Sequence, residues 1–160
     1  MSVWSRFLAQ AWAVVSAGIG CTDAPVDPTP VTSCPEADPT DLVADDAALQ
    51  ACLDRGGTVT LYRAEPGYLL ARGLVITVDE TTLTGAGVGA RARLVAAPAL
   101  SAPLVTAQGR RGFVLRSLEL DGNRPNRPDR QTKCTGYRGA WSTIMINDAS
   151  GFAVDRKSVV

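Results

Sequence analysis

Short runs in which apolar and polar residues alternate dominate the second half of the chain. Within Gly112–Asn123, Phe113 and Leu115 fall on one face of an extended strand. The phase shifts by one residue at Arg116–Ser117, and alternation then resumes in Leu118–Leu120. This pattern predicts two short strands joined by a bend, so that the second strand lies on another wall of the same core. The Asp-Gly-Asn sequence that follows is typical of a turn.

The same arrangement recurs at Leu74–Thr84 and, in part, at Ser142–Asp155. Leu83 and Leu115 are 32 residues apart, and Leu115 and Val154 are 39 apart. Solenoids repeat at roughly 20–45 residues, so these spacings predict parallel strands stacked coil upon coil. The longer spacing predicts one coil with an inserted loop.

Other short strands are expected between Pro and Gly turns, and their spacing would also suit an antiparallel sandwich. The solenoid is favoured because the two-strand corner recurs and hairpin turns are missing between paired runs. The additional expected strands are Thr58–Tyr62, Tyr68–Ala71, Arg93–Val95 and Leu104–Thr106.

A helix is predicted at Asp45–Arg55, with Asp45 as its N-cap and Gly56-Gly57 as its end. An acidic helix start can belong to a ligand site. A cover over the open end of a solenoid is the favoured interpretation, because such an end exposes apolar side chains and unpaired strand edges. The apolar stripe of the helix consists of Leu49, Cys52 and Leu53.

In order and spacing, these pieces resemble the N-terminal part of the pectate lyase superfamily. The resemblance covers about Asp45 to Val160. It implies an all-β fold, an incomplete right-handed parallel β-helix with a short N-terminal capping α-helix. The matching residues are structural ones, so the resemblance implies a fold and no particular activity. They are Asp45–Leu53, Gly56–Leu61, Gly67–Leu70, Leu83–Gly87 and Leu118–Asn123.

The N-terminal segment is predicted to direct export. Residues 1–20 have one positive charge followed by an apolar stretch too short to span a bilayer comfortably. Small residues precede Cys21, which favours a bacterial lipoprotein signal with a lipid on Cys21 as the membrane anchor; ordinary cleavage and secretion is the alternative. Residues 21–40 are rich in Pro, Asp and Thr and are expected to be a tether. Residues 41–160 are then the folded domain.

Composition excludes several functions. Sixteen basic and sixteen acidic residues give a formal net charge of zero, so bulk electrostatics offers no basis for nucleic-acid binding. The chain has no histidine, which excludes a histidine-based catalytic triad and histidine metal ligands within it. No cofactor or metal site is expected in this chain.

The cysteines leave pairing open. Export permits disulfides, and Cys34 could pair with Cys52, although Cys52 also suits a buried thiol on the helix stripe. Cys134 would then be free or pair beyond Val160. The sequence stops soon after the strand-like Phe152–Asp155 with no capping element. We therefore expect an N-terminal piece of a longer protein or a truncated product, or an end that pairs with another chain.

The segment Asp121–Trp141 is the candidate binding region, because it is basic and interrupts the strand pattern. Arginine can pair with the carboxylates of uronic-acid sugars, and aromatic rings can stack on sugar faces. A solvated loop that aids solubility is the alternative. The candidate substrate-binding residues are Arg124, Arg127, Arg130, Lys133, Tyr137, Arg138 and Trp141.

The resemblance implies polysaccharide cleavage by a lyase, which uses calcium and a basic residue, or by a hydrolase with paired carboxylates. Carboxylates after the helix are sparse and no such pair is evident, so no catalytic residue can be assigned. Two hypotheses follow. The chain is the N-terminal part of a carbohydrate-active enzyme on acidic polysaccharide, inactive alone and with calcium possible in the complete protein. Alternatively, it is a non-catalytic envelope scaffold that binds glycan or a surface partner.

Overall fold

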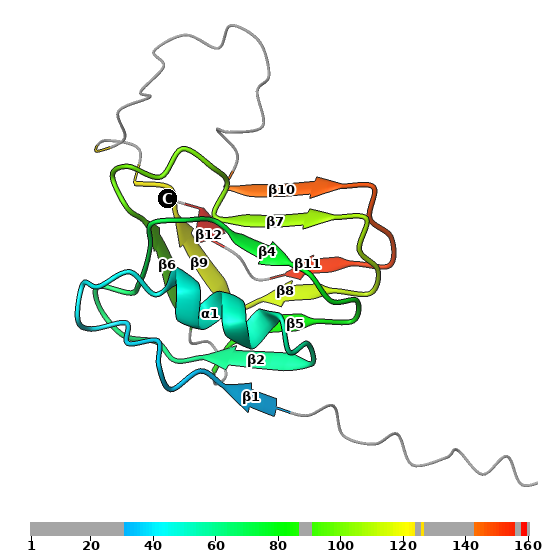
Figure 1. Ribbon diagram of the computed structural model, residues 1–160, viewed down its shortest axis with the longest axis horizontal. Helices are drawn as coiled ribbons and strands as arrows, with labels where there is room; N and C mark the ends of the chain where they lie inside the picture. The colour runs from blue at the N-terminus through cyan, green and yellow to red at the C-terminus, as the bar shows by residue number, and fades with distance from the viewer. Residues whose placement is uncertain (1–30, 87–90, 124–125, 127–142, 156–157, 160) are drawn as a thin grey trace, which may run out of the picture.

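The computed structural model of the protein describes residues 31–86, 91–123, 126, 143–155 and 158–159 (Figure 1). These residues form one helix, α1 (Asp46–Leu53), and twelve short strands. The strands are β1 (Val31–Ser33), β2 (Thr58–Leu61), β3 (Tyr68–Leu70), β4 (Leu74–Ile76), β5 (Thr82–Gly85), β6 (Ala92–Ala96), β7 (Val105–Gln108), β8 (Val114–Arg116), β9 (Leu118–Asp121), β10 (Ile144–Asn147), β11 (Ala153–Asp155) and β12 (Ser158–Val159).

The strands build three parallel sheets, each visited in turn by the chain (Figure 1). The first sheet has the order β1-β2-β5-β8-β11, the second β12-β9-β6-β3 and the third β10-β7-β4. The successive triplets β2-β3-β4, β5-β6-β7 and β8-β9-β10 therefore contribute one strand to each sheet in the same order. Every strand pair among the described residues is parallel, which confirms the predicted all-β class with stacked parallel strands. The antiparallel sandwich is wrong.

Strand register matches the repeat spacing in the sequence. Leu83 pairs with Leu115, and Leu115 pairs with Val154, as the 32- and 39-residue spacings predict. The predicted bend lies at Ser117, where a φ of 54° ends β8 and turns the chain into β9. The expectation that the corners at Ser117 and within Leu74–Thr84 are equivalent is wrong. The corner at Ser117 joins the first sheet to the second, whereas the corner within Leu74–Thr84 joins the third sheet to the first.

The core consists of aliphatic side chains stacked in rows, because in-register parallel strands place equivalent inward positions above one another. Phe113, immediately before β8, is fully buried, and its ring stacks on that of Phe152 with centroids 5.3 Å apart. The rows run through Val59, Leu83, Leu115 and Val154 in the first sheet, Tyr68, Leu94 and Leu120 in the second, and Leu74, Val105 and Ile144 in the third.

The folded structure reaches into the predicted tether. Val31–Ser33 forms β1 and pairs with β2, while Cys34 and Ala37 are buried in the core. Part of the segment predicted as a tether therefore belongs to the folded structure. The Pro- and Asp-rich composition gave no sign of this strand of three residues, which covers the edge that β2 would otherwise expose. Residues 1–30, including the predicted signal and Cys21, lie outside the described residues.

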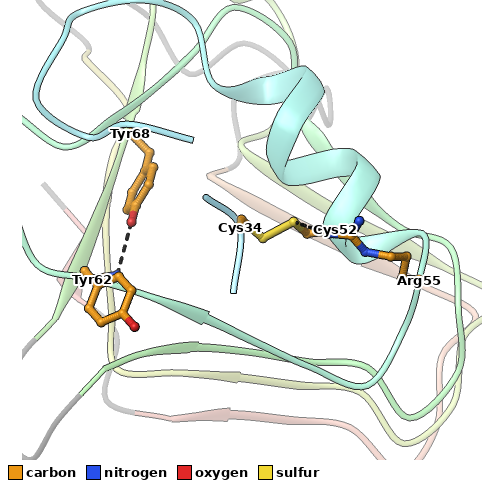
Figure 2. The surroundings of a disulfide bond; sticks show 5 residues. All are labelled: Cys34, Cys52, Arg55, Tyr62 and Tyr68. Carbon is orange, nitrogen blue, oxygen red and sulfur yellow. Dashed lines mark hydrogen bonds between the residues drawn. A yellow bond between two sulfur atoms is a disulfide. The ribbon is translucent and has the colours of Figure 1, made fainter. Parts of the chain in front are cut away.

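A disulfide joins Cys34, just after β1, to Cys52 on α1 (Figure 2). This settles the alternatives for Cys52, which is both disulfide-bonded and fully buried. Arg55 donates from Nη2 to Cys52 Sγ at 3.0 Å. Nearby, the backbone N–H of Tyr62 donates to the hydroxyl of Tyr68 at 3.1 Å, and burial raises the pKa of Tyr68. Cys134 lies outside the described residues.

The helix α1 covers the edge of β4, and Ala44 and Asp45, just before the helix, cover the edge of β3; these are the outermost strands of the third and second sheets. Its apolar stripe is buried as predicted. Asp45 occupies the N-cap position, yet its carboxylate makes no cap to the helix. Instead it accepts hydrogen bonds from the backbone N–H groups of Asp38 and Leu69 at 2.8 and 3.0 Å. Desolvation raises the pKa of Asp45, and these two hydrogen bonds oppose that rise.

Further along α1, side chains continue to satisfy the exposed strand edges. Asp46 accepts a hydrogen bond from the backbone N–H of Ala71 at 3.2 Å. The Gln50 amide pairs with Val75 in both directions, donating to its carbonyl at 2.9 Å and accepting from its N–H at 2.8 Å. A side-chain amide thus takes the place of a neighbouring strand beside β4. The acidic helix start has a structural role of the same kind, which supports the covering interpretation.

We expect Gln50→Ala to lower the free energy of unfolding by about 1–2 kcal/mol, because both hydrogen bonds to Val75 are lost from a partly solvated edge. Amide hydrogen exchange at Val75 should quicken, since its N–H loses its acceptor. Gln50→Glu is the matched control: it keeps the acceptor for this N–H but loses the donor to the Val75 carbonyl and to the Asp54 carboxylate. Wild-type exchange at Val75 in Gln50→Ala would contradict this role.

Candidate functional site

All seven side chains predicted to bind substrate lie outside the described residues, so their positions are untested. They are Arg124, Arg127, Arg130, Lys133, Tyr137, Arg138 and Trp141. The start of the segment is described at Asp121–Asn123. The backbone N–H of Asn123 donates to the Asp121 carboxylate at 2.8 Å, and the Asn123 side-chain amide donates to the Ala96 carbonyl at 2.8 Å. These residues therefore form a structural turn that holds the end of β9 against β6.

A cleft of about 240 Å³ lies beside the second sheet. Its lining comes from three consecutive layers of the fold, because the corner between β2 and β3 lies next to β6, which pairs with β9. Arg93 on β6 and Glu119 on β9 are register partners, so both side chains point away from the core on the same face. The residues that line the cleft are Arg63, Ala64, Glu65, Arg91, Arg93 and Glu119.

Arg93 is the centre of this face, because its guanidinium contacts three carboxylates. Nη1 donates to Glu65 at 2.9 Å, and Nη2 donates to Asp121 at 2.8 Å. Nε lies 3.3 Å from a Glu119 oxygen as an ion pair without hydrogen-bond geometry. The hydrogen bond with Asp121 raises the pKa of Arg93, and the one with Glu65 adds to the rise against the effect of desolvation. One cation therefore ties together three layers of the fold.

Gly67 allows the corner before β3 to approach Arg93. Its φ is +108°, in a region that L side chains rarely adopt. A Cβ at this position would lie 2.8 Å from the Arg93 carbonyl oxygen and 2.9 Å from the Arg93 Cβ, both too close. Glycine here lets the corner that includes Glu65 pack against β6. Turns of Pro and Gly were expected between the short strands, but the contact of Gly67 with Arg93 was not.

Two other arginines that line the cleft make no such contacts with carboxylates of the described residues. Arg63 and Arg91 are exposed, and neither side chain makes a hydrogen bond or ion pair with another described residue. The cleft thus combines one arginine that pairs with three carboxylates and two arginines without a partner among the described residues. Sequence reasoning missed this cluster, because its members are spread from residue 63 to residue 121. The sequence has no signal for it, because Arg93 and Glu119 become register partners only once the pairing of β6 with β9 is known.

The carboxylates of this face are bound to Arg93, which limits their chemistry. A hydrolase needs one carboxyl group to act as an acid and another to act as a base or nucleophile beside the scissile bond. Glu65, Glu119 and Asp121 instead share one guanidinium. Across the described ranges, no group of three or more Cys, Asp or Glu side chains is placed to hold a metal ion. No helix in the same ranges is both long enough and apolar enough to cross a membrane.

No family model matches the chain, and no curated protein or solved structure matches it significantly. Membership of the pectate lyase superfamily therefore stays a prediction from the sequence pattern.

Proposed function

We propose that the chain forms the first coils of a right-handed parallel β-helix in an exported protein of the pectate lyase superfamily. Successive strands visit three parallel sheets in one fixed order, which is the connectivity that a solenoid requires. Connections between parallel strands are right-handed in about 98% of cases, which supports that handedness here. The cover that α1 and β1 provide on one end supports the same proposal, because the N-terminal coil of a solenoid needs a cap.

We further propose that this protein is carbohydrate-active and that this part of it binds acidic polysaccharide. The observation that carries the proposal is the outward, charged face of the second sheet, from whose strand β9 the basic segment Asp121–Trp141 starts. Arginine recognises carboxylates through two parallel hydrogen bonds, so basic side chains on a stiff sheet suit a polyuronate. Binding is favoured over turnover because Arg93 holds the nearby carboxylates.

Retention on immobilised polygalacturonate tests this proposal. We expect the full chain to be retained, to elute as salt rises, and to pass a neutral galactan column unretarded, because exposed charge pairs are screened. The triple substitution Arg124→Gln, Arg127→Gln and Arg130→Gln should lower retention severalfold, whereas Arg116→Gln on the first sheet serves as the control. The protein should release no new reducing ends from polygalacturonate.

Two results would overturn the proposal. Wild-type protein that passes polygalacturonate and galactan alike does not bind acidic polysaccharide. Measurable cleavage of polygalacturonate by the purified chain would show that a catalytic centre is present, contrary to the binding role proposed here.

A further inference from the structure

The disulfide between Cys34 and Cys52 joins two parts of the fold that are held with different firmness. Cys52 lies on the buried stripe of α1 and has 0% of its surface exposed, whereas Cys34 retains 8%. Cys34 directly follows β1, a strand of three residues that pairs, among the described residues, with β2 alone. Short edge elements open locally at a lower free energy than the core of a protein. Local opening of β1 therefore exposes the sulfur of Cys34 before that of Cys52.

A cation lies against the sulfur that stays buried. Arg55 donates from Nη2 to Cys52 Sγ at 3.0 Å (Figure 2). The end of α1 sets up this contact, because the backbone N–H of Arg55 donates to the Cys52 carbonyl at 3.2 Å and so closes a tight turn over the same face. Arg55 forms no ion pair with another described residue. The neighbouring Asp54 carboxylate instead accepts hydrogen bonds from Gln50 and Thr77. The charge of Arg55 is therefore directed at the sulfur.

This arrangement makes the two sulfurs unequal in thiol–disulfide exchange. In that reaction a thiolate attacks one sulfur, and the other sulfur leaves as a thiolate. A neighbouring cation stabilises a thiolate, so exchange is faster when the sulfur beside the cation is the one that leaves. Burial of Cys52 opposes this effect, and so does the C-terminal end of α1, which is equivalent to about half a negative charge. Arg55 places a full positive charge in contact with the sulfur, so we expect its effect to be the larger one.

We propose that Cys34 is a site of modification by small thiols and that Arg55 stabilises the departing thiolate of Cys52. A thiolate RS⁻ attacks Cys34 Sγ and forms a bond with it, the Cys34–Cys52 bond breaks, and its electron pair remains on Cys52 Sγ. A second thiolate then attacks the attached sulfur, which yields RSSR and releases Cys34 as a thiolate. Two thiols are thereby oxidised, one protein disulfide is reduced, and the two protein sulfurs take up the two protons that the thiols lost. The inference is independent of the polysaccharide binding proposed above.

Modification of Cys34 also acts on the edge of the first sheet. Cys34 is nearly as buried as the core side chains around it, so an attached group must displace its neighbours. β1 is the neighbour with the fewest strand contacts, and its displacement uncovers the edge of β2. Amide hydrogen exchange along Val31–Ser33 should therefore quicken in the modified protein. Unchanged exchange there would overturn the opening of β1.

Exposure of the oxidised full chain to reduced glutathione tests the site itself. The reaction is stopped with iodoacetamide in denaturant, which alkylates every thiol that has been released. Proteolysis after Glu36, which lies between the two cysteines in the sequence, separates their peptides for mass spectrometry. We expect glutathione on Cys34 and the alkyl group on Cys52. This measurement uses the wild type alone, so it stands whether or not any variant folds.

Three variants test the role of Arg55. Arg55→Gln should slow reduction by glutathione about tenfold, because the departing thiolate loses a charge-assisted hydrogen bond. Arg55→Lys keeps a cation at this position and should regain most of the rate, whereas a role in packing alone would not be restored by it. Arg63→Gln is the matched control, because it removes an exposed arginine that pairs with no described residue, and it should leave the rate unchanged.

The outcomes divide clearly. Glutathione found on Cys52, or no adduct until urea unfolds the protein, overturns Cys34 as the site of modification. Equal reduction rates in the wild type and Arg55→Gln overturn the stabilisation of the departing thiolate. Glutathione on Cys34, slow reduction in Arg55→Gln and recovery in Arg55→Lys together support the inference.

Discussion

Phe113→Ala is expected to lower the free energy of unfolding by about 3–5 kcal/mol, the largest effect of any substitution considered for this fold. Phe113 is fully buried at the corner that leads into β8, and its ring stacks on Phe152. Truncation removes apolar burial, leaves a cavity between parallel sheets and loses the ring contact, which itself contributes about 0.5–1.5 kcal/mol. Urea unfolding followed by circular dichroism measures the change.

Phe152→Ala is the matched control, because it removes the other ring of the same stack from a side chain that is 43% exposed. It should cost about 1–2 kcal/mol, since water already reaches this ring and less area leaves the core. Equal losses in the two variants would contradict the burial of Phe113 and would place both rings in the same environment.

Loss of the Cys34–Cys52 disulfide is expected to cost about 3 kcal/mol. The bond closes a segment with a sequence separation of 18 and fastens the residue after β1 to the buried stripe of α1. In the unfolded chain this closure removes conformational freedom, so its loss favours unfolding. Substitution of both cysteines by serine, followed by denaturant unfolding with and without a thiol reductant, measures the contribution.

Reductant should destabilise the wild type to about the level of the double serine variant and should leave that variant unchanged. Cys134→Ser is the matched control, because it replaces one cysteine and leaves both disulfide cysteines in place. A double serine variant as stable as the wild type would show that β1 and α1 stay docked without the covalent bond.

Much of the fold was predictable because its strands follow local rules. Alternation located most strands to within about two residues, and the spacing between apolar positions predicted the pairing of Leu83, Leu115 and Val154. The helix was recognisable from its apolar stripe and its glycine end. The strand β1 was missed, because three residues in a Pro-rich segment form a strand only where the edge of β2 is available to pair with them.

The cleft could not be predicted for a related reason. Both Glu65 and Asp121 lie 28 residues from Arg93, in sequence contexts that share no motif. They meet only when strand register and the approach of Gly67 are known. The role of Asp45 was also only partly predicted, since its position at the helix start was right and its hydrogen bonds to Asp38 and Leu69 were not expected. The substrate-binding role of the residues in 124–141 remains a prediction.

The unequal spacing of paired strands has a consequence for protein engineering. Thr58 reaches its partner Thr82 after 24 residues, whereas Val114 reaches Ala153 after 39, and strand register is preserved in both cases. Each doubling of a loop's length adds only about 0.6 kcal/mol of closure cost, so the corners accept extra sequence cheaply. At Gly109 an added Cβ would meet no atom within 4 Å, so a foreign epitope can be grafted beside this residue, provided that Gly109 itself, with a φ of 62°, is kept. The three parallel sheets would then serve as a rigid scaffold that displays the inserted peptide.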